Sequence, residues 1–198
     1  MHKILKTLIT SSIFYNFAAG MLGPIYALFA LEIGGGILVA STAIAIYTAV
    51  IGVLIFIFGR FEDKLDKKKV FILGRAINVV GIFGYIFVSS PTDLFMVQII
   101  LGIAIAMMNP TFEALYSRGL RRGREAFEWS VWEGSIHLVF ALAAITGGVI
   151  AALFGFKVLF MFMTAMALIG FATSTSLARK SVWYELRKIV IKKKSISA

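Results

Sequence analysis

Six long apolar runs dominate the pattern of hydrophobic and polar positions along the chain. They cover Leu8–Leu31, Ile37–Phe58, Val70–Val88, Leu94–Leu115, Trp129–Phe154 and Val158–Leu177. A helix of about 18 residues or more can cross the hydrocarbon core of a bilayer. The runs are continuously apolar, whereas the strands of a membrane barrel alternate, so we predict transmembrane helices. The first run is too long for a signal peptide, and no polar cleavage region follows it directly.

Composition supports a membrane protein and excludes other classes of protein. Of the 198 residues, 60% are hydrophobic and 15% are charged, against about 25% charged in soluble domains. A soluble domain of this length could not bury so much apolar surface. The chain has no cysteine, which excludes a disulfide framework and a thiol nucleophile. We therefore expect an all-α integral membrane protein in contact with the lipid bilayer, with six spans over residues 1–177 and a tail over residues 178–198.

The basic residues predict how the spans are oriented. Of the 20 Lys and Arg residues, 19 fall at the N-terminus, in or next to the second and fourth connections, or in the tail, and Lys157 alone falls on the other side. Lys and Arg are retained on the cytoplasmic side of a membrane. We therefore predict a multi-pass protein of the plasma (inner) membrane with both termini in the cytoplasm. The net charge of +10 then marks the face next to anionic lipid, and we expect no nucleic-acid partner.

The tail has an amphipathic pattern of its own. Val182, Leu186 and Ile189 fall on one helical face with Trp183, and most of the basic residues of the tail fall elsewhere. This pattern predicts a C-terminal amphipathic helix that lies in the membrane interface. A solvated basic tail is the alternative.

The second connection carries the most specific motif in the chain. Residues 59–69 read Gly-Arg-Phe-Glu-Asp-Lys-Leu-Asp-Lys-Lys-Lys. This segment resembles the signature of the major facilitator superfamily (MFS), which lies between the second and third spans on the cytoplasmic side. The matching residues are Gly59, Asp63, Lys64, Lys67 and Lys68, and Asp66 stands where the family has its second glycine.

The resemblance implies one half of the family's architecture. A complete member has two six-span halves, each built from 3+3 inverted repeats, and this chain resembles the N-terminal half. The implied function is secondary transport of a small, unidentified solute, either by a homodimer of halves or together with a second six-span half. The alternative is a half-length, non-transporting membrane protein or assembly subunit that requires a second chain. The chain shows no nucleophile motif of a membrane protease and no glycine-rich phosphate loop, so we expect neither an enzyme nor a cofactor.

The same resemblance suggests a conformational gate. In full members the motif aspartate meets the cytoplasmic end of the eleventh span, whose counterpart in this half is the fifth span. In a dimer we therefore expect Asp63 to face the start of the fifth span of the second copy. The motif lysines would then face Glu125 and Glu128. The alternative is that the motif only satisfies local helix ends.

Polar residues inside the spans are the candidates for cavity or coupling sites: Asn16, Gln98, Asn109, Glu133 and His137. Glu133 and His137 are four residues apart and share a helix face, where they could carry a proton or bind a cationic substrate. A structural pair is the alternative. The other three lie on the first and fourth spans, which line the cavity in the family, although hydrogen bonds between helices are an ordinary alternative.

Three further observations concern proton coupling, metal binding and the placement of the polar residues of the third span. Gln98 stands where many coupled family members have an arginine, which argues against proton coupling of the usual antiporter type. Glu133 and His137 supply only two metal ligands, which is too few for a metal site. Arg75 and Asn78 in the third span are expected to snorkel toward the interface or to pack against neighbours.

Overall fold

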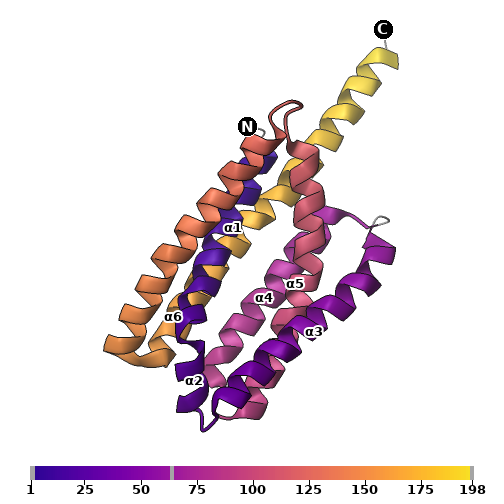
Figure 1. Cartoon of the computed structure of the whole chain (residues 1–198). Coiled ribbons are helices and arrows are strands. Elements are labelled where there is room, and N and C mark those ends of the chain that lie inside the picture. Colours follow the sequence, from indigo (N-terminus) through magenta and orange to yellow (C-terminus); the bar gives the residue numbers. More distant parts are fainter. Residues whose placement is uncertain (1–2, 63–64, 197–198) are drawn as a thin grey trace.

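The protein is a bundle of long helices (Figure 1). The computed structural model describes the backbone of residues 3–62 and 65–196 and the side chains of residues 5–60 and 65–177. Its elements are α1 (Lys3–Leu22), η1 (Gly23–Ile25), α2 (Tyr26–Glu32), α3 (Ile37–Glu62), α4 (Lys67–Gly84), η2 (Tyr85–Phe87), α5 (Pro91–Gly119) and α6 (Glu125–Ile196). The η elements are single turns of 3-10 helix. Every described element is helical, which confirms the predicted all-α class.

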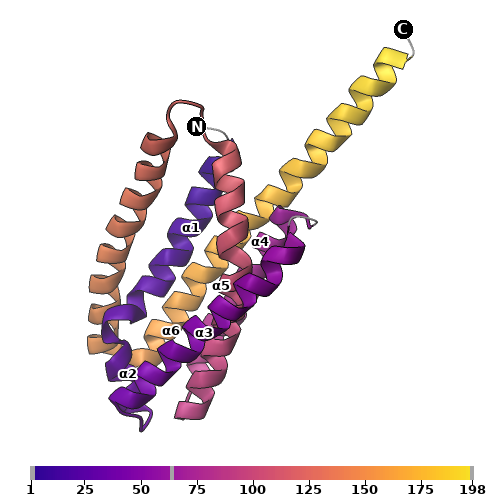
Figure 2. The same cartoon turned by 45° about the vertical axis from the view of Figure 1, so that its right-hand side comes forward.

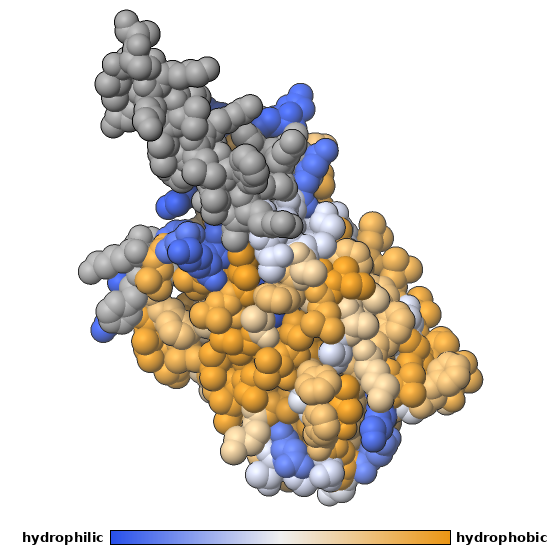
Figure 3. Space-filling view, turned by 180° about the vertical axis from the view of Figure 1, so that it is seen from behind, coloured by the Kyte–Doolittle hydropathy of each residue, from blue (hydrophilic) through white to orange (hydrophobic). Residues whose placement is uncertain are grey.

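Five helical segments of the described chain are long and apolar enough to cross a membrane. They are Leu5–Glu32, Ile37–Arg60, Lys67–Phe87, Pro91–Gly119 and Glu125–Leu177. The first contains the 3-10 turn at Gly23–Ile25, because Pro24 lacks the amide hydrogen that a continuous helix requires. Figure 3 shows one face of the molecule, on which a broad hydrophobic band separates hydrophilic residues at the two ends. Membrane helices are therefore confirmed.

The last and longest segment changes direction at Gly155. This residue has φ 81° and ψ 170°, a region that is essentially restricted to glycine. The helix consequently consists of two arms, residues 125–154 and 156–196, which meet in a sharp turn (Figure 1). The predicted connection between the fifth and sixth runs is thus reduced to a single non-helical residue.

Both arms of α6 pack closely on α1. A Cβ atom at Gly147, in the first arm, would lie 2.0 Å from the carbonyl oxygen of Met21. A Cβ atom at Gly170, in the second arm, would lie 3.0 Å from the carbonyl oxygen of Ser11. Small residues allow membrane helices to approach in this way. On the other side of the bundle, α5 packs against α3 and α4, and α4 also packs against α6.

The connections gather at two ends of the bundle (Figure 2). The N-terminal end of α1, the end of α3, the start of α4, and the connection between α5 and α6 lie at one end, and the second arm of α6 projects beyond that end. The opposite end holds the connection after α2, the connection before α5, and the turn at Gly155. The basic connections therefore share one end, as the charge pattern predicted. The orientation in a membrane stays a prediction.

The predicted interfacial helix falls on residues 178–198. The backbone of α6 is helical as far as Ile196. The side chains that would make this segment amphipathic lie outside the described residues.

Candidate functional site

A cavity of about 280 Å³ lies among α1, α3, α4 and α5, with Met163 of α6 in its wall. Most of its surface is apolar and comes from residues such as Leu22, Ile44, Ile82 and Leu101. Its polar lining residues are Tyr15, Tyr26, Tyr47, Thr48, Asn78, Tyr85 and Gln98. Small-molecule sites in proteins have this character, with apolar walls and a few placed polar groups, and begin at about 300 Å³.

Gln98 is the predicted site residue that the fold brings into this cavity. It lies on α5, and only 5% of the residue is exposed. Its amide nitrogen Nε2 donates to the hydroxyl of Tyr26 and, over 3.3 Å, to the hydroxyl of Tyr85. Tyr26 begins α2 and Tyr85 follows α4. One amide therefore joins three parts of the bundle at the cavity wall.

A buried arginine lies directly behind another part of the wall. Arg75, on α4, is 3% exposed, and its Nη2 donates to the Oγ of Ser12 over 2.6 Å. Its guanidinium carbon lies 4.3 Å from the ring centroid of Tyr15 and 4.9 Å from that of Phe71. Its Nε and Nη1 have no hydrogen-bond partner among the described residues. Of the two expectations for Arg75, the structure shows packing in the interior and not snorkelling.

The two asparagine candidates lie outside the cavity lining. Asn16, on α1, is half-buried, and its Nδ2 donates to the backbone oxygen of Ser12 over 2.7 Å. Asn109, on α5, is exposed. Neither belongs to the residues that line the cavity.

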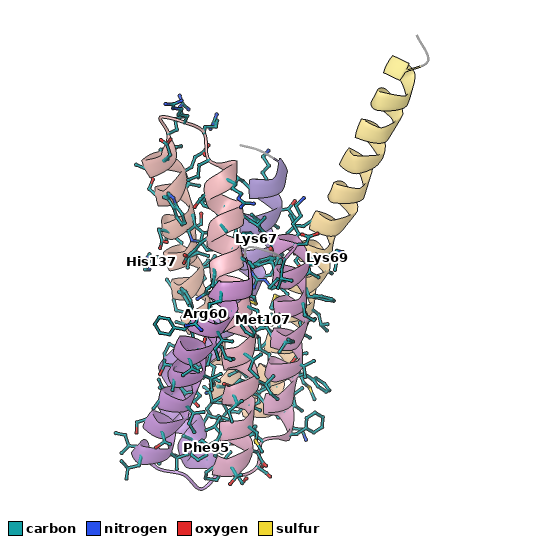
Figure 4. The ribbon with its side chains drawn as sticks, turned by 90° about the vertical axis from the view of Figure 1, so that its right-hand side faces the viewer. Arg60, Lys67, Lys69, Phe95, Met107 and His137 are labelled. Carbon is teal, nitrogen blue, oxygen red and sulfur yellow. The ribbon has the colours of Figure 1, made fainter. Side chains whose placement is uncertain are left out.

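Glu133 and His137 lie together on the first arm of α6, and both are exposed. Figure 4 shows His137 on this arm, far across the view from Lys69. Neither residue lines the cavity. Within the described part of the chain, no three His, Cys, Asp or Glu residues come close enough to hold a metal ion.

The signature motif lies at the end of the bundle that carries the basic connections. Gly59 is exposed near the end of α3, Lys67 is 8% exposed at the start of α4, and Lys68 is half-buried. Asp63 and Lys64 lie outside the described residues. Asp66 is the N-cap of α4, and its carboxylate accepts a hydrogen bond from the backbone nitrogen of Lys68 over 3.0 Å. The residue that departs from the family pattern thus begins a helix.

Glu128, one of the two acidic residues expected to face a partner's lysines, forms an ion pair within its own chain. Its Oε1 accepts from Nε of Arg121 over 2.7 Å, and its Oε2 accepts from the backbone nitrogen of Arg121 over 2.9 Å. The side chain is 3% exposed. The turn at Gly123, which has φ 79°, brings the two residues together. Of the two acidic residues expected to face a partner's lysines, the exposed one is Glu125.

Sequence reasoning assigned no site role to Tyr26, Tyr85 or Arg75. Tyrosines near the ends of spans ordinarily serve as interfacial anchors, so nothing in the pattern distinguishes these two. Arg75 and Asn78 did offer a signal, because two polar residues one helical turn apart in an apolar run share a face. The structure shows that this face is turned into the bundle, since both side chains are 3% exposed.

Comparison with known proteins identifies the family. The family model for the Major Facilitator Superfamily matches residues 8–190. Multidrug resistance protein MdtG of Enterobacter lignolyticus is 23% identical over 182 residues, which cover 89% of this chain and 43% of that protein. MdtG of Klebsiella pneumoniae is 22% identical over 184 residues, which cover 90% of this chain and 44% of that protein. An uncharacterised MFS-type transporter of Methanocaldococcus jannaschii is 27% identical over 148 residues, or 72% of this chain and 37% of that protein.

The chain thus spans less than half the length of the curated relatives it matches. The family match covers all five of the candidate membrane-spanning segments in whole or in large part. On this evidence the chain belongs to the major facilitator superfamily, a family of membrane transporters and not of enzymes.

Proposed function

We propose that this chain is one six-span lobe of a solute transporter and that its cavity is part of the solute pathway. The observation that carries the proposal is a cavity among the helices whose mostly apolar lining includes seven polar residues. Polar groups at membrane depth are costly and mark solute pathways when they face a cavity. The mostly apolar walls suit an amphipathic solute of small size.

The packing of the helices supports two inverted repeats of three spans each. In this proposal the first repeat holds α1 with α2, then α3, then α4, and the second holds α5 and the two arms of α6. The first helix of each repeat packs against the two later helices of the other repeat. Helix α1 packs against both arms of α6, and α5 packs against α3 and α4. A two-fold relation between the repeats requires this exchange of first helices.

We propose that a second lobe covers part of this one, and the exposed polar residues of the first arm of α6 support this proposal. Glu133 and His137 are exposed inside a candidate span, and a charged side chain in lipid costs about 2.5–3.5 kcal/mol. A second six-span lobe, either another copy of the chain or a different chain, would remove them from lipid. In such an assembly Asn109, Glu133 and His137 become candidates for the cavity between lobes, and the motif around Gly59 becomes a candidate gate.

Two relatives carry the name of multidrug resistance proteins, so we propose amphipathic aromatic compounds as solutes. We further propose that both termini face the cytoplasm and that residues 178–198 lie in the inner-membrane interface. The alternative is an assembly subunit that transports nothing without a second chain.

The test measures two quantities: the release of a dye from vesicles that contain the chain, and the molecular mass of the chain in detergent. The purified chain is placed in vesicles loaded with 8-anilinonaphthalene-1-sulfonate, and the release of this dye is followed by its fluorescence. We expect release faster than from protein-free vesicles, slowed at least tenfold by Gln98→Leu and unchanged by Gly148→Ala. The mass of the detergent-solubilised chain should be twice that of one copy. A monomer that releases no dye would refute transport by the chain alone and favour the assembly subunit.

A further inference from the structure

We infer that the cavity prefers anionic over cationic aromatic solutes, because a buried positive charge without an acidic partner among the described residues lies directly behind its tyrosine wall. The inference rests on the proposed function, in which this cavity is part of the solute pathway. It names the charge class of the solute.

The source of the charge is Arg75. Its position eight residues after the start of α4 places it about 12 Å along the helix, well inside the span. Only 3% of it is exposed. An arginine stays protonated in proteins even when buried, so the guanidinium is a permanent positive charge in the interior.

Among the described residues, the contacts of this guanidinium are with neutral groups. It donates to the hydroxyl of Ser12 and lies over the rings of Tyr15 and Phe71. Its Nε and Nη1 are without a hydrogen-bond partner among the described residues. Buried charges are ordinarily paired, but no carboxylate among the described residues pairs with Arg75 to cancel its field.

The cavity lies within reach of that field. Tyr15 and Asn78, which follows Arg75 by one helical turn, both line the cavity. A solute in contact with the Tyr15 ring would lie about 8–10 Å from the guanidinium carbon. At an effective dielectric constant of about 20, one unit of charge at that distance changes affinity about 15- to 30-fold. The effect favours an anion and opposes a cation.

The hydroxyl groups of the wall agree with this preference. Gln98 donates its amide hydrogens to the oxygens of Tyr26 and Tyr85. Each hydroxyl proton is therefore left to donate to another acceptor. None of the cavity's lining residues, within the described part of the chain, is Asp, Glu, Lys, Arg or His. A carboxylate or sulfonate would find donors here, and an ammonium group would find no anionic partner.

The experiment measures binding of three probes that share one ring system. These are naphthalene-2-sulfonate, 2-naphthamide and 2-naphthylmethylammonium, titrated by calorimetry into the full chain in nanodiscs of zwitterionic lipid. We expect the sulfonate to bind at least tenfold more tightly than the amide, and the ammonium to bind most weakly. Arg75→Gln should remove the advantage of the sulfonate and leave the affinity for the amide unchanged.

Two variants serve as controls. Arg75→Lys keeps the charge and should keep the preference for the sulfonate. Arg60→Gln removes one positive charge from an exposed position near the end of α3 (Figure 4) and should also leave the preference intact. If Arg75→Gln does not fold, the ranking of the three probes by the unchanged chain still decides the question.

The inference is overturned if the unchanged chain binds the three probes equally or binds none of them. It is also overturned if folded Arg75→Gln still prefers the sulfonate. Binding in the expected order without dye release from vesicles would refute the proposed transport and leave the charge preference standing. Dye release without a preference among the probes would overturn the charge preference alone.

Discussion

At the scale of single residues, the polar groups of the interior are held by a small number of contacts between helices. Gln98 donates to two tyrosine hydroxyls, and Arg75 donates to one serine hydroxyl. A buried polar group that loses its partner in lipid cannot turn to water instead. Gln98 consequently contributes to the structure as well as to the cavity wall, and Arg75 contributes to the packing behind that wall.

Gln98→Leu should lower the free energy of unfolding by about 1 kcal/mol, in the range that hydrogen bonds between membrane helices contribute. The loss arises because the substitution removes the donor to the hydroxyls of Tyr26 and Tyr85. Titration with sodium dodecyl sulfate in mixed micelles measures the change. The triple variant with Tyr26→Phe and Tyr85→Phe should recover part of the loss, since no hydroxyl is then left without its donor. Unchanged stability in Gln98→Leu would contradict these hydrogen bonds.

At the scale of the helices, two structural features position the elements: capping residues at the starts of helices and glycines where helices cross. Ser90 and Asp93 form a capping box at the start of α5, and Asp66 caps α4. These caps satisfy backbone amides that a helix start leaves unpaired. The glycines let helix axes approach closely enough for backbone to contact backbone.

Asp66→Ala should lower the free energy of unfolding by about 1 kcal/mol, the usual contribution of an N-cap. The lost contact is the hydrogen bond from the backbone nitrogen of Lys68 to the carboxylate. Exchange of the Lys68 amide hydrogen with solvent should become faster at the same time. Asp66→Ser supplies another capping oxygen and should behave like the unchanged chain. Equal exchange rates in Asp66→Ala and Asp66→Ser would show that the cap is unimportant.

Gly147→Ala and Gly148→Ala form a matched pair on α6. The added Cβ at Gly147 would lie 2.0 Å from the carbonyl oxygen of Met21, whereas the Cβ at Gly148 would have nothing within 4 Å. We expect Gly147→Ala to destabilise the chain by about 1–3 kcal/mol through forced separation of α1 and α6. Gly148→Ala should be neutral or stabilising by up to about 1 kcal/mol, because alanine favours helix. Thermal unfolding in detergent compares the two, and equal melting temperatures would argue against this helix contact.

At the scale of the whole molecule, the fold collects the basic connections at one end. The connections after α3 and after α5 lie at the same end as the start of α1, and Lys157 lies next to the turn at the other end. A bundle with this distribution has one preferred orientation in a membrane, because translocation of Lys and Arg is disfavoured.

Single-cysteine labelling tests this orientation without background, because the chain contains no cysteine. Lys69→Cys and Arg122→Cys change exposed residues of the basic end, and Lys157→Cys changes an exposed residue of the opposite end. In intact cells, a membrane-impermeant maleimide should label Lys157→Cys alone. After permeabilisation all three should be labelled. Labelling of Lys69→Cys from outside intact cells would reverse the proposed topology.

The amino-acid sequence alone was sufficient to predict the helices, the gathering of basic residues at one end of the bundle, and the family. Apolar runs of bilayer length have one low-energy structure in lipid, since a helix satisfies its own backbone hydrogen bonds. The break at Pro24 could also be read locally, because it depends on a missing amide hydrogen. The motif at residues 59–69 needed only spacing and place along the chain to indicate the family.

The tertiary structure alone decided which polar residues meet. Gln98 and Tyr26 are 72 residues apart, and Arg75 and Ser12 are 63 apart. Helical periodicity says which residues share a face but not which helix lies against that face, and in lipid no general hydrophobic force turns a face inward. For this reason the sequence did not indicate that Gln98 lines the cavity while Asn16 and Asn109 do not. The pair between Glu128 and Arg121 depends on the turn at Gly123, a contact that the apolar pattern did not predict.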